Sequence, residues 1–382
     1  MVWRVYMKYI HPRSTSPCTA INTSQQPCLE PQRPWTARLA SAGCATLLLS
    51  ACSSLPSHDS LLATPVNAPH RQDARAEFRQ HFCAQYDAAA NRDAPRCEYW
   101  LWHMPDEPAA TAMPPGRAPA AAGGATRYQV VIVPGAFGEC FGADANPFSE
   151  GVAALHARGV DISVVRVEGR SGTARNAQIL AAWLEQHGHA EIPRILIGYS
   201  KGLADILQYT VDFPESARRV KAVISIAGAT AGTPIADADA GFFDATLAHL
   251  PNAQCGPGDG RVVDDLRHDV RSTWLAQHPL PGHIRYFSVA AFTTRERMAR
   301  ALMPPWRRLL ASDPHNDGQV RVRDSVIPGS TLLGFVNADH WETAFAMERR
   351  HAFLAGRQAT TSFPRQALLE AVLGTVVESI EE

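Results

Sequence analysis

The sequence lacks the features that mark several large classes of protein. Its 382 residues carry 36 basic and 37 acidic side chains, so no excess of positive charge favours nucleic acid as a partner. The eight cysteines form no C-x-x-C pair and no Cys/His spacing typical of zinc sites. No internal repeat is present, and no apolar run is long enough to span a bilayer permanently. We therefore expect no metal, no cofactor and no nucleic-acid partner.

What the chain does have, near its beginning, is a pattern typical of export. Arg33 and Arg38 precede a modest apolar run, Leu39–Ala51, which ends in small residues before Cys52. This order resembles a bacterial lipoprotein signal, in which the cysteine thiol is acylated and becomes the new N-terminus. The resemblance implies lipidation of Cys52 and a membrane anchor in the cell envelope. Ser53 after the cysteine favours the outer membrane or its periplasmic face, again by resemblance to other lipoproteins.

Two other interpretations of this segment stay open. Cys52 could stand by chance in an alanine-rich tract, and the protein could be secreted without a lipid.

Composition predicts three parts along the chain. A leader would cover residues 1–51, a tether and N-terminal segment residues 52–125, and one large domain residues 126–382. Residues 53–75 are polar and contain proline, as expected of a tether.

Export makes disulfides possible. Cys83, Cys97, Cys140 and Cys255 would remain beside the lipidated cysteine, and four cysteines allow three pairings. We expect Cys83–Cys97, where a bridge closing a loop of about 15 residues contributes about 3 kcal/mol, with Cys140–Cys255 as the second pair. Free buried thiols are the alternative. Residues 76–105 could form a small separate disulfide module, although we expect them to pack against the large domain.

From residue 128 onward, short apolar runs alternate with amphipathic stretches. The runs predict strands at Tyr128–Val133, Asp161–Val167, Arg194–Ile197, Val220–Ile226, Ile284–Ala291 and Thr331–Val336. Helical periodicity covers residues 173–187, 201–213 and 364–379. Strands that alternate with helices predict an α/β fold with a mostly parallel central sheet flanked by helices.

About fifty residues, 232–283, interrupt this alternation. They contain a predicted helix at Val262–Leu275, and an insertion of this size over a parallel sheet is a candidate cap or lid. Its apolar side chains would form either an acyl-chain pocket or ordinary core, and they include Phe242, Phe243 and Leu247.

The segment Gly198-Tyr199-Ser200-Lys201-Gly202 fits the pattern G-x-S-x-G. A serine on a tight strand-to-helix turn needs glycine two residues before and after it, because bulk at either position would clash. Chance alone supplies this pattern in roughly one chain in ten of this length. Its place between a predicted strand and a predicted helix favours Ser200 as a nucleophile over a glycine-flanked surface turn.

A serine nucleophile needs a base and an orienting carboxylate. His340 directly follows the last predicted strand, where the base should stand. Asp317 lies in a polar turn before that strand and is our candidate acid. Asp313, Asp324 and Asp339 are neighbours that the sequence alone leaves open.

The reaction also needs two N–H donors for the oxyanion, each worth about 3 kcal/mol. One is expected from the Lys201 backbone. The second is expected from the glycine-rich loop Pro134–Gly138, with Ala136 as first choice and Phe137 as runner-up. The loop could equally be a plain connection.

These motifs together resemble bacterial lipases and esterases of the α/β-hydrolase superfamily. The matching segments are G-Y-S-K-G, P-G-A-F-G, N-D-G-Q-V at 316–320 and N-A-D-H-W at 337–341, within residues 126–345. The resemblance implies an α/β-hydrolase fold with a cap insertion and hydrolysis of a small-molecule or lipid carboxylic ester through an acyl-enzyme. It implies Ser200 as nucleophile, Asp317 as acid and His340 as base.

The sequence departs from these lipases at two positions. Pro134 stands where many have histidine, and Lys201 stands where histidine, glutamine or methionine is commoner. Both departures leave the backbone donors in place but bear on the substrate. A thioesterase, an acyltransferase or a peptidase could use the same triad, and a non-catalytic envelope lipoprotein could keep the fold.

Overall fold

The computed structural model describes residues 70–89, 94–109, 122–138, 146–189, 191–237, 256–346 and 362–382. All of these belong to the larger of two compact units, Leu55–Glu382. Several sequence predictions lie outside the described residues, namely the leader, lipidation at Cys52, the pair Cys140–Cys255 and the insertion side chains Phe242, Phe243 and Leu247.

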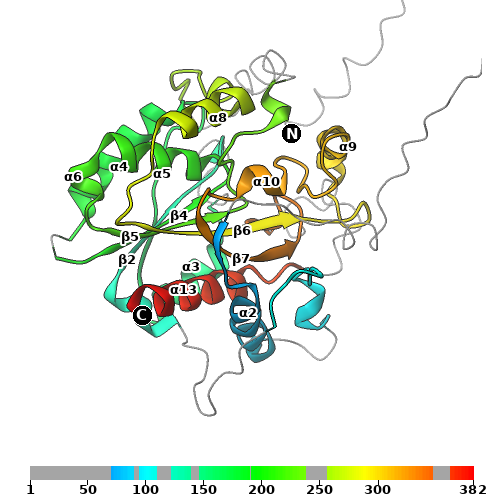
Figure 1. Ribbon diagram of the computed structural model, residues 1–382. Coiled ribbons are helices and arrows are strands. Elements are labelled where there is room, and N and C mark those ends of the chain that lie inside the picture. Colours follow the sequence, from blue (N-terminus) through cyan, green and yellow to red (C-terminus); the bar gives the residue numbers. More distant parts are fainter. Residues whose placement is uncertain are drawn as a thin grey trace, which may run out of the picture. The chain divides into compact units, whose positions relative to one another are not determined.

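A seven-stranded sheet forms the centre of the described part of the chain (Figure 1). Its strands are β1 His70–Asp73, β2 Gln129–Val133, β3 Asp161–Val164, β4 Arg194–Tyr199, β5 Val220–Ile226, β6 Arg285–Phe292 and β7 Ser330–Asn337. They pair in parallel in the order β1-β7-β6-β5-β4-β2-β3. The six runs predicted as strands are all present, and the predicted α/β class with a parallel sheet is confirmed.

Helices cover both faces of this sheet (Figure 1). One face carries α2 Arg75–Ala89, α3 Ser149–Ala157 and α13 Arg365–Glu381. The other carries α4 Thr173–His187, α5 Lys201–Asp212, α6 Pro214–Ala217 and α8 His268–Gln277. Two further helices follow β6, namely α9 Met303–Leu310 and α10 Val322–Ser325. None of the helices in the described ranges is both long and apolar enough to cross a membrane.

Successive residues of the central strands enter two separate cores. On β2, Val130 and Ile132 join the core under α2, α3 and α13, whereas Val131 and Val133 join the core under α4 and α5. All four side chains are fully buried. Burial on both faces explains why these strands are continuous apolar runs and show no alternation with polar residues.

Strand β1 corrects the predicted domain boundary. His70–Asp73 falls in the segment expected to be a tether, yet it pairs in parallel with β7 at the edge of the sheet. Its sequence, HRQD, has no apolar alternation, so periodicity could not reveal it. The domain therefore begins well before residue 126.

The segment that follows β1 belongs to the same domain. Phe78 and Phe82 of α2 are fully buried in the core that α13 also lines. The predicted disulfide Cys83–Cys97 is present and joins α2 to a short 3₁₀ helix, Cys97–Tyr99. Residues 76–105 thus pack against the large domain, as expected, and do not form a separate module.

The helix predicted at Val262–Leu275 is broken in the structure. A 3₁₀ turn covers Asp264–Leu266, and α8 begins only at His268. Between them Arg267 is extended, with ψ 137°, so the chain changes direction there. The insertion is described over residues 232–237 and 256–283.

Candidate active site

Ser200 occupies a strained turn between β4 and α5. Its φ of 54° lies in the left-handed region that side chains rarely adopt. A Cβ on Gly198 would lie 2.3 Å from the Leu203 Cα, and one on Gly202 would lie 2.1 Å from the carbonyl oxygen of Val133. Backbone atoms fill both places, so the turn Gly198–Gly202, which we call the elbow, requires its two glycines, as the motif predicts.

His340 reaches Ser200 from the loop after β7. Its Nε2 lies 2.9 Å from the Ser200 Oγ. The Tyr199 hydroxyl donates a 2.7 Å hydrogen bond to the His340 carbonyl oxygen. Burial raises the pKa of Tyr199 well above its usual value, so this phenol stays a neutral donor. Tyr199 therefore helps to fix the loop that carries the imidazole.

Asp317 stands on the opposite side of the imidazole, in a turn of residues 313–320 that we call the acid turn. Its Oδ2 accepts a 2.7 Å hydrogen bond from the His340 Nδ1. Its Oδ1 accepts the amides of Gln319 and Val320 at 2.8 and 2.7 Å. Because an ionised carboxylate can only accept, Nδ1 holds the proton and Nε2 is left to accept from the serine.

The choice among the neighbouring acids follows from their contacts. Asp339, although adjacent to His340, accepts the backbone amides of Glu342 and Ala299 through its two carboxylate oxygens, each at 2.8 Å. It therefore orders the loop that carries the base, whereas Asp317 contacts the imidazole ring itself.

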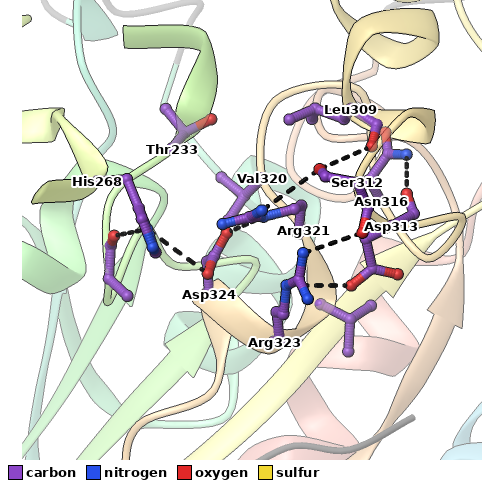
Figure 2. Close-up of polar contacts among 12 residues, drawn as sticks. Thr233, His268, Leu309, Ser312, Asp313, Asn316, Val320, Arg321, Arg323 and Asp324 are labelled. Atoms are coloured by element: carbon purple, nitrogen blue, oxygen red, sulfur yellow. Dashed lines mark hydrogen bonds and ion pairs between the residues drawn. The ribbon is translucent and has the colours of Figure 1, made fainter. Parts of the chain in front are cut away.

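Asp313 and Asp324 pair with arginines beside the acid turn, and Asp324 also lies 3.7 Å from the His268 Nδ1 (Figure 2). Arg321 forms an ion pair with Asp324 and donates to the Ser312 hydroxyl at 3.3 Å. Arg323 donates to the Ser312 carbonyl oxygen at 3.0 Å, and its Nε lies 3.4 Å from the Asp313 carboxylate. These pairs tie both ends of the acid turn to α10.

The glycine-rich loop after β2 passes directly over the serine. A Cβ on Gly135 would lie 2.9 Å from the Ser200 Cβ and 3.2 Å from its Oγ. The Phe137 amide is already used, since it donates to the carbonyl oxygen of Gly169 at 2.9 Å. The Ala136 amide makes no hydrogen bond to another residue of the described ranges. Lys201 is the first residue of α5, so its amide has no acceptor within the helix.

Sequence reasoning missed an arginine that supports the loop after β7, which carries the proposed base His340 and which we call the base loop. The Arg297 Nη2 donates to both carboxylate oxygens of Glu342, each at 2.8 Å. Its guanidinium lies 5.1 Å from the ring centroid of Tyr99 and 4.8 Å from that of Trp100. Burial raises the pKa of Glu342 to about 8, although Arg297 opposes the shift. The only signal in the sequence was the position of Glu342, two residues after His340.

No family model and no curated protein sequence matches this chain. Among solved structures, a metagenomic carboxyl esterase, MGS0156, is 32% identical with a TM-score of 0.73, and the alignment covers 84% of this chain and 98% of that one. The mature lipase BlEst2 of Bacillus licheniformis is 22% identical with a TM-score of 0.46, over 60% of this chain and 89% of that one. Given its likeness to the first of these along nearly the whole of that protein, the chain belongs to the α/β-hydrolase superfamily as an esterase- or lipase-like hydrolase.

Proposed function

We propose that this protein is a serine hydrolase that cleaves carboxylic esters, with Ser200 as nucleophile. One observation carries the proposal: a continuous hydrogen-bonded chain runs from the Ser200 Oγ through both nitrogens of His340 to the Asp317 carboxylate. The loops that supply these residues follow β4, β6 and β7, and the carboxyl ends of parallel strands meet at one edge of a sheet.

In the proposed reaction, the Ser200 hydroxyl gives its proton to the His340 Nε2 as its oxygen attacks the ester carbonyl carbon. The amides of Lys201 and Ala136 donate to the resulting oxyanion. His340 then protonates the departing alcohol, which leaves an acyl-serine. A water molecule gives a proton to His340 and attacks the acyl carbon, and the proton returns to Ser200 as the carboxylic acid leaves. Asp317 stabilises the imidazolium in each half-reaction.

The choice of a carboxylic ester over a thioester or an amide as substrate has a separate basis. The relative that is 32% identical carries the description carboxyl esterase, and its alignment with this chain includes most of the described domain. Hydrolysis of a thioester or an amide would use the same nucleophile and the same oxyanion donors. Measured activity on each class of substrate therefore separates an esterase from a thioesterase or a peptidase.

Hydrolysis of a series of p-nitrophenyl esters from acetate to palmitate tests the proposal. We expect release of p-nitrophenol without an added acceptor, and a fall of at least about a thousandfold in kcat for Ser200→Ala. The matched control is Ser216→Ala in α6, whose hydroxyl lies 2.8 Å from that of the buried Tyr209, and it should keep wild-type kcat. Absence of turnover with every ester, or turnover only with an added alcohol or amine, would contradict an esterase.

A further inference from the structure

A buried ion pair stands next to Ser200 along α5. Lys201 and Asp205 lie one helical turn apart, each with a side chain 1% exposed, and the ammonium pairs with the carboxylate. The Asn176 Nδ2 of α4 donates to the other oxygen of Asp205 at 2.9 Å. Burial raises the pKa of the Asp205 carboxyl, and Lys201 opposes this shift. Because both charges lose their hydration, such a pair adds little stability over apolar side chains of similar size. We therefore expect the Lys201–Asp205 pair to have a role other than stability.

A second buried cation lies on the insertion. Arg271 of α8 is 1% exposed, and its guanidinium lies 4.4 Å from the ring centroid of Trp274. The carboxylates of Asp205 and Asp265 are the negative charges that act on it. The Asp205 carboxylate is thus paired with Lys201, whereas Arg271 lies beyond ion-pair distance and is influenced by the same negative charge.

Arg271 also contacts the segment that holds the backbone of Ser200. Its Nε donates a long hydrogen bond, 3.4 Å, to the Thr230 carbonyl oxygen. The preceding residue, Ala229, donates its amide to the Ser200 carbonyl oxygen at 2.9 Å. Arg271 therefore contacts the segment that holds the elbow at the exit of β5, through the Thr230 carbonyl oxygen.

Two aspartates of the insertion fix it against α4 as well. The Asp259 Oδ1 accepts the Gly172 amide at 2.8 Å, and the Asp265 Oδ2 accepts the Thr173 amide at 2.7 Å. Acceptors at the first turn of a helix satisfy free amides and complement its dipole. The described part of the insertion is thus docked on the first turn of α4 by polar contacts.

We propose that Lys201, Asp205 and Arg271 form a positioning unit that holds the elbow in its reactive geometry and links the insertion to Ser200. This inference rests on the proposed function. Ser200 occupies a strained backbone conformation, which persists only where surrounding contacts over-determine it. Donors to an oxyanion must be held within about 0.5 Å of their productive positions. A buried ion pair in the first turn of α5, together with a guanidinium that contacts the exit of β5, restricts the elbow and its first amide more strictly than non-directional apolar contacts.

A pair of arginine substitutions on the insertion tests this unit. Arg271→Met removes the buried cation, whereas Arg267→Met removes a cation directly before the same helix, which is 41% exposed and pairs with Asp269 at 3.2 Å. For a soluble p-nitrophenyl ester we expect kcat of Arg271→Met to fall about tenfold to a hundredfold, with KM changed less than about threefold. Arg267→Met should keep both constants within about twofold. Equal kcat values for the two variants would overturn the proposal.

A second set of variants separates positioning from folding and carries the test if Arg271→Met does not fold. Lys201→Met and Asp205→Asn each leave a buried charge without its partner, so both should lower the melting temperature. The double variant removes both charges and should regain most of that loss. The positioning unit predicts that its kcat nevertheless stays at least about tenfold below wild type. Recovery of kcat together with the melting temperature would show a purely structural pair and overturn the proposal.

The same assays keep this inference apart from the proposed function. If the wild-type protein hydrolyses no ester, the proposed function itself fails. If the wild type is active, Ser200→Ala is inactive and the Arg271 variant matches wild type, then only the positioning unit is wrong.

Discussion

Backbone atoms at the elbow explain why a motif singles out the nucleophile, whereas the sequence predicts Asp317 as the acid but leaves its neighbours open. Gly198 and Gly202 are required by contacts with Leu203 and Val133, which lie within or directly beside the elbow. Val133 belongs to β2, but both contacts fall on the two glycines whose spacing defines the motif, so the motif reveals them. Asp317 depends instead on how a turn after β6 meets a loop after β7, and several nearby aspartates fit the same pattern. Only the 2.7 Å contact with the His340 Nδ1 distinguishes it.

A matched pair of asparagine substitutions tests the role of the acid. In Asp317→Asn the side chain no longer holds the His340 Nδ1 proton or stabilises the imidazolium, so we expect kcat to fall by roughly three to four orders of magnitude. Asp313→Asn alters the same turn away from the imidazole and should lower kcat less than about tenfold. Steady-state kinetics with one p-nitrophenyl ester measures both. Equal losses in the two variants would remove Asp317 from the proposed triad.

Glu342 predicts a dependence of stability on pH. Its pKa in the folded state is raised to about 8 from a usual value of 4.5, mainly by burial. The folded protein therefore binds a proton that the unfolded chain releases, so this contribution to stability is complete below pH 4.5 and is lost as the pH rises to 8.

Urea unfolding from pH 5 to pH 8.5 measures the effect. Relative to Glu342→Gln, which cannot titrate, wild type should lose unfolding free energy as the pH rises, with a slope of at most about 1.4 kcal/mol per pH unit. Parallel pH profiles for the two proteins would contradict the assignment.

Among the secondary-structure elements, burial decided what the sequence could reveal. The strands buried on both faces carry continuous apolar runs, and all six were predicted within a few residues. Strand β1 is polar and lies at the sheet edge, so it has no such signal. The break before α8 was also missed, because Arg267 changes backbone conformation without a glycine or a proline to mark it.

The disulfide stabilises an element that supports the base loop. The segment after Cys97 runs beside β7: the Asn337 amide donates to the Trp100 carbonyl oxygen at 2.8 Å, and the Trp102 amide donates to that of Phe335 at 2.9 Å. Replacing Cys83 and Cys97 by serine opens a loop with a sequence separation of 14. We expect a loss of about 3 kcal/mol in unfolding free energy in urea.

Reduction supplies the control for that measurement. Dithiothreitol should shift wild type toward the double serine variant and leave the variant unchanged. Coincident unfolding curves for oxidised wild type and the variant would show that the bridge contributes nothing.

For the molecule as a whole, composition and the alternation of predicted strands with predicted helices were sufficient to predict the fold class. The predicted location of the protein in the cell rests instead on its N-terminal sequence pattern. Export stays a proposal, and the disulfide between Cys83 and Cys97 would persist in the oxidising compartment that this proposal implies. The lipid anchor stays a proposal, carried by the basic residues, the short apolar run and Cys52.

Mass spectrometry of the mature N-terminus tests the anchor. We expect a first residue at Cys52 that carries acyl chains, and release of the protein into the soluble fraction for Cys52→Ala. An unacylated N-terminus beyond residue 52 in the wild-type protein would refute lipidation while leaving the hydrolase fold untouched.

The central claim is that Ser200 is the nucleophile, and covalent labelling with a fluorophosphonate followed by peptide mapping tests it most directly. The probe reacts with serines that an adjacent base activates. We predict one adduct, on the peptide that contains Ser200, absent in Ser200→Ala and formed at a much lower rate in His340→Ala. Folded wild-type protein that takes up no label, or that carries the label on a different serine, would contradict the account.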